Sequence, residues 1–309
     1  MHALAELGSI VVGALRDTAA MVFDPSERIY WLFLLSAGLI AIVVSRLSPR
    51  STPARGSWWL DLKLLVANAV LGALALAVWT VSAFGLAVVL VTRLDAAFGP
   101  ERIETFSPML VCLAYTVVLF IASDASRFLV HWLMHVIGPL WELHKVHHSA
   151  ERLTPLTLYR AHPIERAIYA LRGVIVTGTI TALFFHGFGR DAVELELLGV
   201  NALGFLFNLV GANLRHSNVW WSWGRIERVL LSPAQHQLHH GIDGTHTLNL
   251  GTWLACWDRW AGTFREAGSR PPIAFGLPAR ERNHDPDRLG SVLWHPLRAA
   301  VSRARAHIF

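Results

Sequence analysis

Cysteine and charged residues are both scarce in this sequence. The 309 residues include only two cysteines, Cys112 and Cys256, which lie far apart and outside any CxxC pair. This spacing favours neither a disulfide framework nor a zinc site built on thiolates. Charged residues make up 16% of the chain, against about 25% in ordinary soluble proteins, while hydrophobic residues make up 53%. The balance predicts a membrane protein.

The excess of positive charge does not have the pattern of a nucleic-acid surface. The net charge is +5 and the isoelectric point is near 9.8. The arginines flank apolar runs, however, and do not form a basic stripe with interleaved aromatic residues. Basic residues in such positions set membrane topology and meet anionic lipid head groups. We therefore expect a bilayer as a partner, and no nucleic acid.

Apolar runs divide the chain into an expected domain organisation. The runs cover residues 29–44, 64–91, 109–122, 167–185 and 195–214. They predict an all-α integral membrane protein with four to five transmembrane helices. We expect residues 1–28 to form an N-terminal amphipathic or peripheral segment, 29–264 the membrane-embedded domain and 265–309 a polar cytoplasmic tail. The N-terminus lacks the basic region and the small-residue site of a cleaved leader, so none is expected.

Arginines after the first apolar run predict the orientation in the membrane. Arg46, Arg50 and Arg55 lie in one short polar segment, which the positive-inside rule places in the cytoplasm. Counting the runs from there, 167–185 and 195–214 form a hairpin that leaves the cytoplasmic face and returns to it. Residues 131–162 and 216–246 then end on the same, cytoplasmic face. A multi-pass protein with one joint site on that side is predicted.

Histidines are concentrated in those two segments. At helical spacing, His131 and His135 lie at i, i+4, and the triplet HxxHH of residues 144–148 lies at i, i+3, i+4, so that each set points to one side of its helix. A second HxxHH occupies residues 236–240. Converging imidazoles are a common way to hold a transition metal. The predicted metal ligands are His131, His135, His144, His147, His148, His162, His216, His236, His239 and His240.

The number of histidines exceeds what one metal ion can use, so we expect two ions with four or five nitrogen ligands each. Imidazole accepts iron, zinc, copper or nickel, but reaction with oxygen would favour iron because zinc has no redox chemistry. Carboxylates that support ligand imidazoles are expected nearby, and Asp124, Glu165 and Asp258 are the candidates for this role. A metal carrier is the alternative, although its ligands should lie inside the spans and here the histidines follow them.

Three of these assignments stay open from the residues alone. His162 precedes a proline, so it is either a ligand or a hydrogen-bond partner of Glu165. Asp124 follows an apolar run and either caps a helix or holds a ligand histidine. Asp258 either orients an imidazole or forms an ion pair with Arg259 or another arginine.

Several motifs, in one order, resemble those of a known family. They are LWELHKVHHS (140–149), RAHPIE (160–165), RHSN (215–218), SPAQHQLHH (232–240) and NLGTWLACWDRWAGTF (249–264). From about residue 124 to 264 the chain resembles the fatty acid hydroxylase superfamily, which includes sterol desaturases and sterol methyl oxidases. The resemblance implies a histidine-ligated diiron enzyme that uses O2 to hydroxylate or desaturate a C–H bond of a fatty acyl or sterol-like lipid. Within RHSN it favours His216 as a ligand.

The sequence departs from the family pattern at a few positions. Trp132 stands where members usually have arginine, Trp260 and Ala261 alter the closing motif, and Leu250 replaces an aromatic residue. All core histidines are kept, so the departures bear on substrate shape more than on the metals. No HPGG haem motif is present, and electrons are expected from a separate cytochrome b5- or ferredoxin-like protein. Zinc can replace iron in such a protein on purification.

Overall fold

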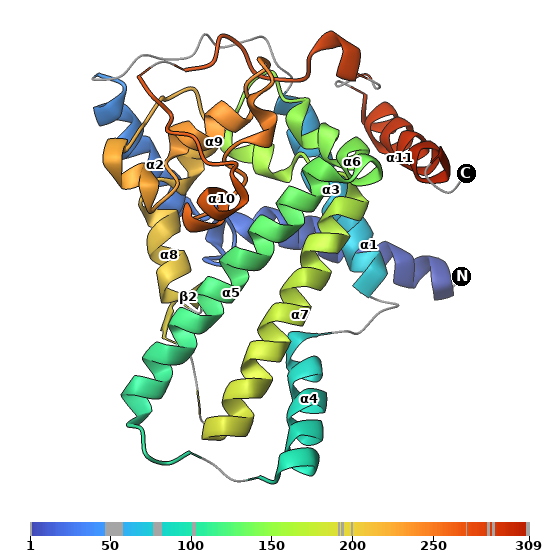
Figure 1. The fold of residues 1–309 in the computed structure, drawn as a ribbon. Helices are drawn as coiled ribbons and strands as arrows, with labels where there is room; N and C mark the ends of the chain where they lie inside the picture. The colour runs from blue at the N-terminus through green and yellow to red at the C-terminus, as the bar shows by residue number, and fades with distance from the viewer. Residues whose placement is uncertain are drawn as a thin grey trace.

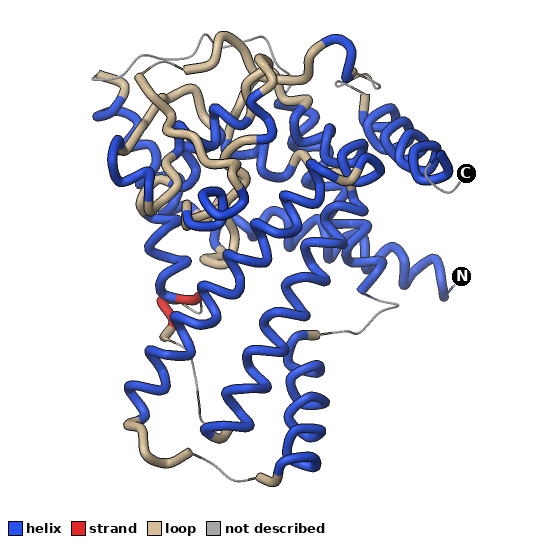
Figure 2. The backbone as a smooth tube through the Cα atoms, in the orientation of Figure 1, coloured by secondary structure: helices blue, strands red, loops and turns tan. Residues whose placement is uncertain are grey.

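The chain is mostly helical. The computed structural model describes residues 2–46, 58–76, 82–100, 103–190, 192, 195–198, 200–269, 271–282, 285 and 288–306. Within these residues it has eleven α-helices, short 3-10 helices and one antiparallel pair of two-residue strands, so strand structure is minimal (Figure 2). The predicted all-α class is confirmed.

The elements before the first histidine-rich segment are four helices and one 3-10 turn. They are α1 (His2–Ala20), η1 (Met21–Phe23), α2 (Trp31–Val44), α3 (Trp58–Leu76) and α4 (Ala83–Phe98). The histidine-rich half begins with α5 (Pro108–Val136), α6 (Gly138–His148), η2 (Pro155–Tyr159) and α7 (Pro163–Phe188). The strands β1 (Glu196–Leu197) and β2 (Val200–Asn201) lead into α8 (Ala202–Leu209).

The remaining elements are short until the last helix. They are η3 (Ala212–His216), η4 (Gly224–Arg228), α9 (Pro233–His239), η5 (Thr245–Thr247), α10 (Cys256–Ala261), η6 (Ala279–Glu281) and α11 (Leu289–Ala306). Most of them gather, with α6, around the end of α5 that carries its histidines (Figure 1). The α11 helix packs against α6, where the Arg303 guanidinium lies 2.8 Å from the buried Glu142 carboxylate. The domain boundaries at residues 28 and 264 stay a prediction.

The long helices α5 and α7 form the axis of the molecule (Figure 1). Each begins at a capped proline: Ser107 accepts a hydrogen bond from Leu110 N–H before α5, and His162 accepts one from Ile164 N–H before α7. With 29 and 26 residues, they are about 43 and 39 Å long. Both exceed the hydrocarbon thickness of a bilayer, which is about 30 Å.

Aromatic and small residues hold these helices together. The Tyr115 ring of α5 stacks on the Phe184 ring of α7 with centroids 4.6 Å apart, and the Tyr115 hydroxyl lies 2.6 Å from the Thr181 hydroxyl. The α4 helix packs along the other side of α7. It approaches closely at Gly178, where an added Cβ would lie 2.8 Å from the Ala83 carbonyl oxygen. A glycine at this position therefore allows the two helices to pack.

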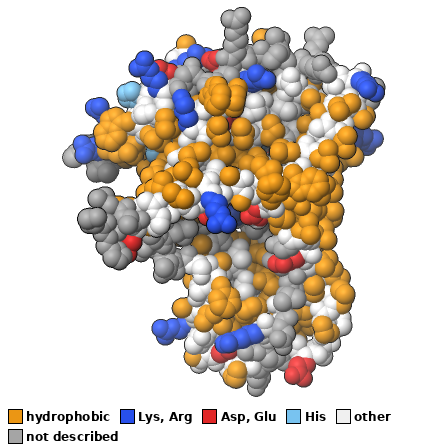
Figure 3. Space-filling model, turned by 180° about the vertical axis from the view of Figure 1, so that it is seen from behind, with side chains coloured by type: hydrophobic (Ala, Val, Ile, Leu, Met, Phe, Trp, Pro, Cys, Tyr) orange, Lys and Arg blue, Asp and Glu red, His pale blue; other side chains and the backbone are white. Residues whose placement is uncertain are grey.

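Three of the described helices are long and apolar enough to cross a membrane: α3 over Trp58–Ala75, α5 and α7. Hydrophobic side chains cover much of the back face, and most of the lysines and arginines visible there lie towards its two ends (Figure 3). This pattern is that of a membrane protein. The shorter apolar helix α2 has 14 residues, about 21 Å, which is less than a bilayer core needs.

Two predicted spans are not single helices. The run 64–91 is divided, since α3 ends at Leu76 and α4 begins at Ala83 after the cap Ser82. The run 195–214 contains β1, β2, α8 and η3. The eight residues of α8 are about 12 Å long, too short to span. A count of four to five spans stays a prediction, and the segment around Arg50 and Arg55 lies outside the described residues.

The close contact at Gly178 predicts a strong effect of a larger side chain. Gly178→Val should lower the free energy of unfolding by about 1–3 kcal/mol, because the added methyl groups overlap α4. Thermal melting in detergent measures the loss. Gly173→Val, on the same helix with nothing within 4 Å of its added Cβ, is the matched control. Equal melting temperatures of the two variants would contradict this packing.

Candidate metal centre

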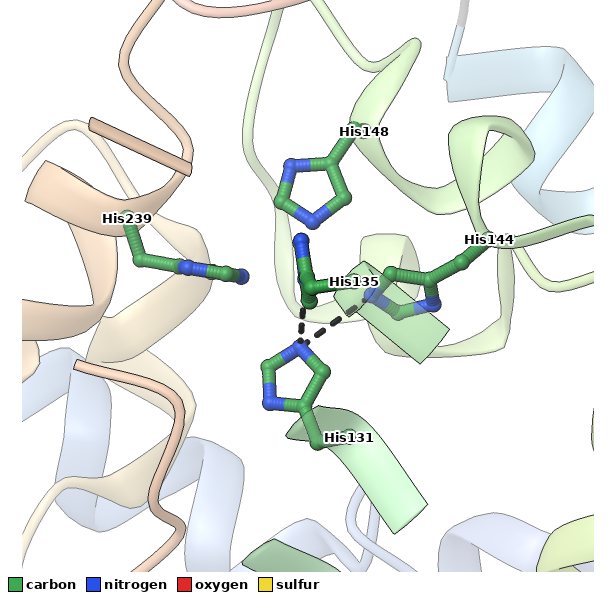
Figure 4. Close-up of side chains that lie close together, drawn as sticks. All are labelled: His131, His135, His144, His148 and His239. Carbon is green, nitrogen blue, oxygen red and sulfur yellow. Dashed lines mark hydrogen bonds between the residues drawn. The ribbon is translucent and has the colours of Figure 1, made fainter. Parts of the chain in front are cut away.

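Nine of the ten predicted histidine ligands lie in two compact groups. The first histidine group is His131, His135, His144, His148 and His239, and the second is His147, His216, His236 and His240. In each group one ring nitrogen per residue lies within 4.8 Å of all the others. Figure 4 shows the five rings of the first group pointing toward one another from separate parts of the chain. Two segments that are distant in the sequence are therefore brought together, as expected.

The two HxxHH motifs each serve both groups. In α6, His144 and His148 are four residues apart and enter the first group, whereas His147 enters the second. At the second motif the division is reversed, because His236 and His240 share the second group and His239 crosses to the first. Residues four apart lie one above the other on a helix, and the histidine between them points about 60° away from the first and about 100° away from the last. The spacing alone predicts that each set lies on one side of its helix, which is wrong for His147 and His239.

Distances between ring nitrogens match those between ligands of one ion. The Nε2 atom of His131 lies 3.1 Å from that of His144 and 3.2 Å from that of His135. Two nitrogens that bind one metal at about 2.1 Å and at a right angle lie about 3 Å apart. The first group therefore has the spacing of a metal site.

The second group gives a stronger argument. The Nε2 atoms of His216, His236 and His240 form a triangle with sides of 3.0, 3.2 and 3.2 Å. A neutral imidazole nitrogen is either a donor or an acceptor. Among three such nitrogens, at least two must both be donors or both be acceptors. Hydrogen bonds alone therefore leave one of the three contacts unfavourable. A cation removes the conflict, since all three nitrogens then present lone pairs to it.

Outer hydrogen bonds orient the rings of the first group. The Nδ1 atoms of His131 and His239 donate to the carbonyl oxygens of Leu250, at 2.6 Å, and Leu248, at 2.9 Å. A carbonyl only accepts, so the proton of each ring lies on Nδ1 and the Nε2 lone pair is free to bind a metal. The buried Nε2 of His239 accordingly has no hydrogen-bond partner among the described residues. These backbone acceptors have no sequence signature, so residue patterns could not predict them.

The histidines outside the long helices are held neutral. Burial, together with the neighbouring imidazoles, lowers the pKa of His147 to about 3 and that of His239 well below its usual value. Burial alone lowers the pKa of His144 to about 3. Neutral imidazole is the form that binds metals, and this donor set suits iron, zinc, copper or nickel. The residues present therefore fit transition-metal ions.

The three predicted carboxylates have different positions. Glu165 contacts a histidine directly, as its Oε1 accepts from His144 Nδ1 at 2.8 Å. Asp258 acts one step away: it accepts from the Leu250 N–H at 2.7 Å, and the Leu250 carbonyl in turn holds His131. The ion pair of Asp258 with Arg259 is not seen among the described residues.

Asp124 holds the loop before α10 instead of a histidine. Its two oxygens accept from the backbone N–H groups of Trp253 and Leu254 and from Trp257 Nε1, at 2.9–3.0 Å. The carboxylate thus ties α5 to the segment that carries Leu250. Both alternatives from the sequence, a helix cap and a histidine partner, are replaced by this role.

Two further histidines of the histidine-rich segments, His162 and His246, lie outside both groups. His162 begins α7, and its two ring nitrogens are engaged by the Ile164 N–H and, at 3.0 Å, by the Leu293 carbonyl. The structure does not bring it to the metal-ligating positions, and it is a helix cap instead. His246 stacks on the Trp141 ring, with centroids 5.1 Å apart, beside the first group.

A cavity of about 590 Å³ adjoins both groups. Five histidines of the two groups contribute to its wall, and the rest comes from α5, α7 and α8 and from the loops that pack against them. Its lining includes the apolar side chains of Leu119, Phe120 and Trp253, with Phe120 stacked on Trp253 at 4.6 Å. A cavity of this size suits part of a lipid-sized ligand.

Removing the charge of Asp124 should destabilise the protein. In Asp124→Asn, an amide donor faces backbone N–H groups, and at least one buried donor loses its acceptor. The expected loss is about 1–3 kcal/mol of unfolding free energy, measured by thermal melting in detergent. Asp243→Asn, at an exposed position, is the control. A melting temperature equal to the control's would show that the loop does not depend on Asp124.

Acid should destabilise the metal-free protein. The folded-state pKa values of His144 and His147 are lowered to about 3, so the unfolded chain binds more protons as the pH falls below about 6.5. Stability should therefore decrease from about pH 6.5 towards pH 3. Melting of chelator-treated protein at a series of pH values measures this. His147→Gln should weaken the dependence, and a constant melting temperature down to pH 5 would contradict it.

Comparison with known proteins agrees with this geometry. The fatty acid hydroxylase family matches residues 116–263. An ornithine lipid hydroxylase of Rhizobium tropici is 27% identical over 176 residues, 54% of this chain and 47% of that protein. Alkylglycerol monooxygenases of Danio rerio and Homo sapiens are 28% and 26% identical over 166 residues, 51% of this chain and 32% of each.

These alignments have limits that bear on function. The chain spans less than half the length of each of these relatives. No solved structure is significantly similar to it. The matched segment nevertheless contains both histidine groups, their carboxylates and the loop that orients them. This segment is therefore similar to the fatty acid hydroxylase family.

Proposed function

We propose that the protein is a membrane-bound oxidoreductase whose two histidine groups hold two iron ions, and that it uses O2 and external electrons to hydroxylate a C–H bond of a lipid. The observation that carries the proposal is the pair of adjacent imidazole groups. Each has the nitrogen spacing of ligands of one ion. The names of the relatives, a lipid hydroxylase and monooxygenases, favour hydroxylation over desaturation.

The proposed ligands divide as the groups do. His131, His135, His144, His148 and His239 would hold one ion, and His147, His216, His236 and His240 the other. The groups adjoin, because the rings of His148 and His240 have centroids 4.7 Å apart. This proximity supports a pair of ions acting together. His162 is not included, because both its nitrogens have other partners.

The chain's own part is to orient ligands, exclude water and position the lipid. Glu165 and the Leu248 and Leu250 carbonyls keep the outer nitrogens protonated and the inner ones free. Burial of the rings keeps bulk water from the site. The cavity between α5, α7 and α8 would hold the substrate beside the histidines. When bound, the iron ions would supply the oxidising power, which no side chain here has.

We further propose that the site faces the cytoplasm and takes electrons from a separate cytochrome b5- or ferredoxin-like protein. The arginines around residues 46–55 support that orientation by the positive-inside rule. The described part of the α5 and α7 helices supports a position at one end of the spans, because His131 and His135 lie in the last turns of α5 and Glu165 in the first turn of α7. A carrier would have its ligands near the middle of the spans.

Metal content of group-specific variants tests the proposal. Protein from cells grown on labelled iron should contain two irons per chain. His239→Ala removes one ligand of the first group, and His147→Ala removes one of the second. Each variant should therefore lose up to one iron, and the double variant should lose both. His162→Ala, a cap outside the groups, should keep both and serves as the control. Mössbauer spectra of the oxidised wild-type protein should report two coupled irons.

Lipid extracts of the same cells provide the second readout. A hydroxylated lipid should be present with the wild type and absent with the double variant. Zinc with no iron from iron-replete cells, together with an unchanged lipid profile, would refute the oxidoreductase and favour a carrier. Iron loss in His162→Ala but not in His239→Ala would refute the ligand assignment.

A further inference from the structure

The cavity beside the histidines carries an excess of positive charge. Its wall contains two carboxylates, and each accepts a hydrogen bond from a group other than an arginine. Glu27 accepts from the Tyr159 hydroxyl at 2.9 Å, and Glu165 accepts from His144 Nδ1 at 2.8 Å. Five arginines line the same cavity: Arg28, Arg127, Arg166, Arg172 and Arg215. The neutral imidazoles do not offset this charge, and metal ions would add to it.

Arg127 lacks a free carboxylate partner in the described part of the chain, because Asp124, which attracts it from the same helix, already accepts from backbone N–H groups. Arg127 lies on α5 one helical turn before His131, and its guanidinium is 5.4 Å from the centroid of the Trp253 ring. Its Nε is buried and has no hydrogen-bond partner among the described residues. The buried Nε of Arg172, on α7, is in the same state. Charged residues within apolar helices are costly and mark functional positions.

Arg28 and Arg215, which also line the cavity, contact only neutral groups of the residues that the structure describes. Arg28 donates to the Asn208 side-chain oxygen, and Arg215 lies 3.5 Å from the Leu231 carbonyl oxygen. Neither forms an ion pair with a described residue. Asp124 also attracts Arg215, but its oxygens already accept from backbone N–H groups.

The arginines repel one another across the cavity. Burial, followed by the charges of Arg215 and Arg127, lowers the pKa of Arg28 to about 9. Burial also lowers the pKa of Arg215 to about 10, with a contribution from Arg127. Three guanidinium groups from three separate segments thus lie close enough to interact. An anion between them would reverse the repulsion, and the planar guanidinium suits carboxylate and phosphate.

We propose that Arg28, Arg127 and Arg215 bind the anionic head group, a phosphate or carboxylate, of the lipid that the protein oxidises. The inference rests on the proposed function, because it identifies the substrate class of the same site. Along α5, Arg127 lies about 6 Å from His131 and Leu119 about 18 Å from it. The anion then lies between the histidines and the apolar end of the cavity. The oxidised C–H bond lies within a few bonds of the head group, and the rest of the chain extends away from the histidines.

Binding of matched lipids tests the inference without requiring turnover. The full chain in a non-ionic detergent is titrated with three probes that share a palmitoyl chain: palmitoyl-glycerol phosphate, N-palmitoylglycine and neutral monopalmitoylglycerol. We expect at least one anionic probe to bind about tenfold or more tightly than the neutral one. The tighter of the two anionic probes identifies phosphate or carboxylate as the recognised group.

Arginine variants separate recognition from general effects of charge. Arg127→Gln should weaken binding of the anionic probe by about tenfold and leave binding of the neutral probe unchanged. Arg127→Lys keeps the positive charge but loses the planar guanidinium that can donate two parallel hydrogen bonds. Its affinity for the anionic probe should lie between those of the wild type and Arg127→Gln. Arg288→Gln, whose side chain is 83% exposed, is the matched control and should bind all probes as the wild type does. Melting temperatures check that each variant is folded.

The outcomes distinguish this inference from the function on which it rests. Equal affinity of the wild type for all three probes, or unchanged anionic binding by folded Arg127→Gln, would overturn the head-group site. If iron and lipid hydroxylation were present at the same time, the proposed function would stand. Selective anionic binding in a protein that contains no iron and oxidises no lipid would leave the head-group site and refute the oxidoreductase.

Discussion

Buried imidazole nitrogens that face one another impose the constraint on which this structure depends. Neutral rings in a group of three cannot all exchange hydrogen bonds, as the triangle of His216, His236 and His240 illustrates. Such an arrangement is costly without a cation. The surrounding structure must therefore hold the rings in place, and it does so through successive hydrogen bonds. The His131 ring is held by the Leu250 carbonyl, the Leu250 N–H by Asp258, and the neighbouring loop by Asp124 on α5.

Different parts of the fold provide the apolar helices and complete the histidine groups. The long helices α5 and α7 supply apolar length, and their ends bring His131 and Glu165 to one level. Short helices and loops then approach from outside to complete both groups (Figure 1). Because the cavity runs from this end along α5, a ligand in it contacts apolar side chains, arginines and histidines in turn. The same arrangement would let a bilayer lipid reach a site beyond the hydrocarbon core.

Much of the site was predictable because its chemistry leaves a local signal. Nine of the predicted histidines lie close together in two adjacent groups, and the motifs resemble the family whose model matches the chain. The assignment of His162 was not supported, because a histidine before proline has the same local sequence whether it caps a helix or binds a metal. The membrane spans were harder to predict. The run 195–214 is apolar enough for one helix, but the Leu195 N–H donates a hydrogen bond to the Thr116 hydroxyl, and the chain turns at Gly211, which has a positive φ.

The sequence by itself determined that the chain is an apolar helical protein with more clustered histidines than one ion can use. Composition and residue spacing are local properties, and both follow directly from the order of residues. Only the tertiary structure decided that each HxxHH divides between two groups, that Asp124 holds a loop, and that Arg28, Arg127 and Arg215 share a cavity. These depend on the relative placement of segments up to about 190 residues apart, which packing determines and local spacing does not encode.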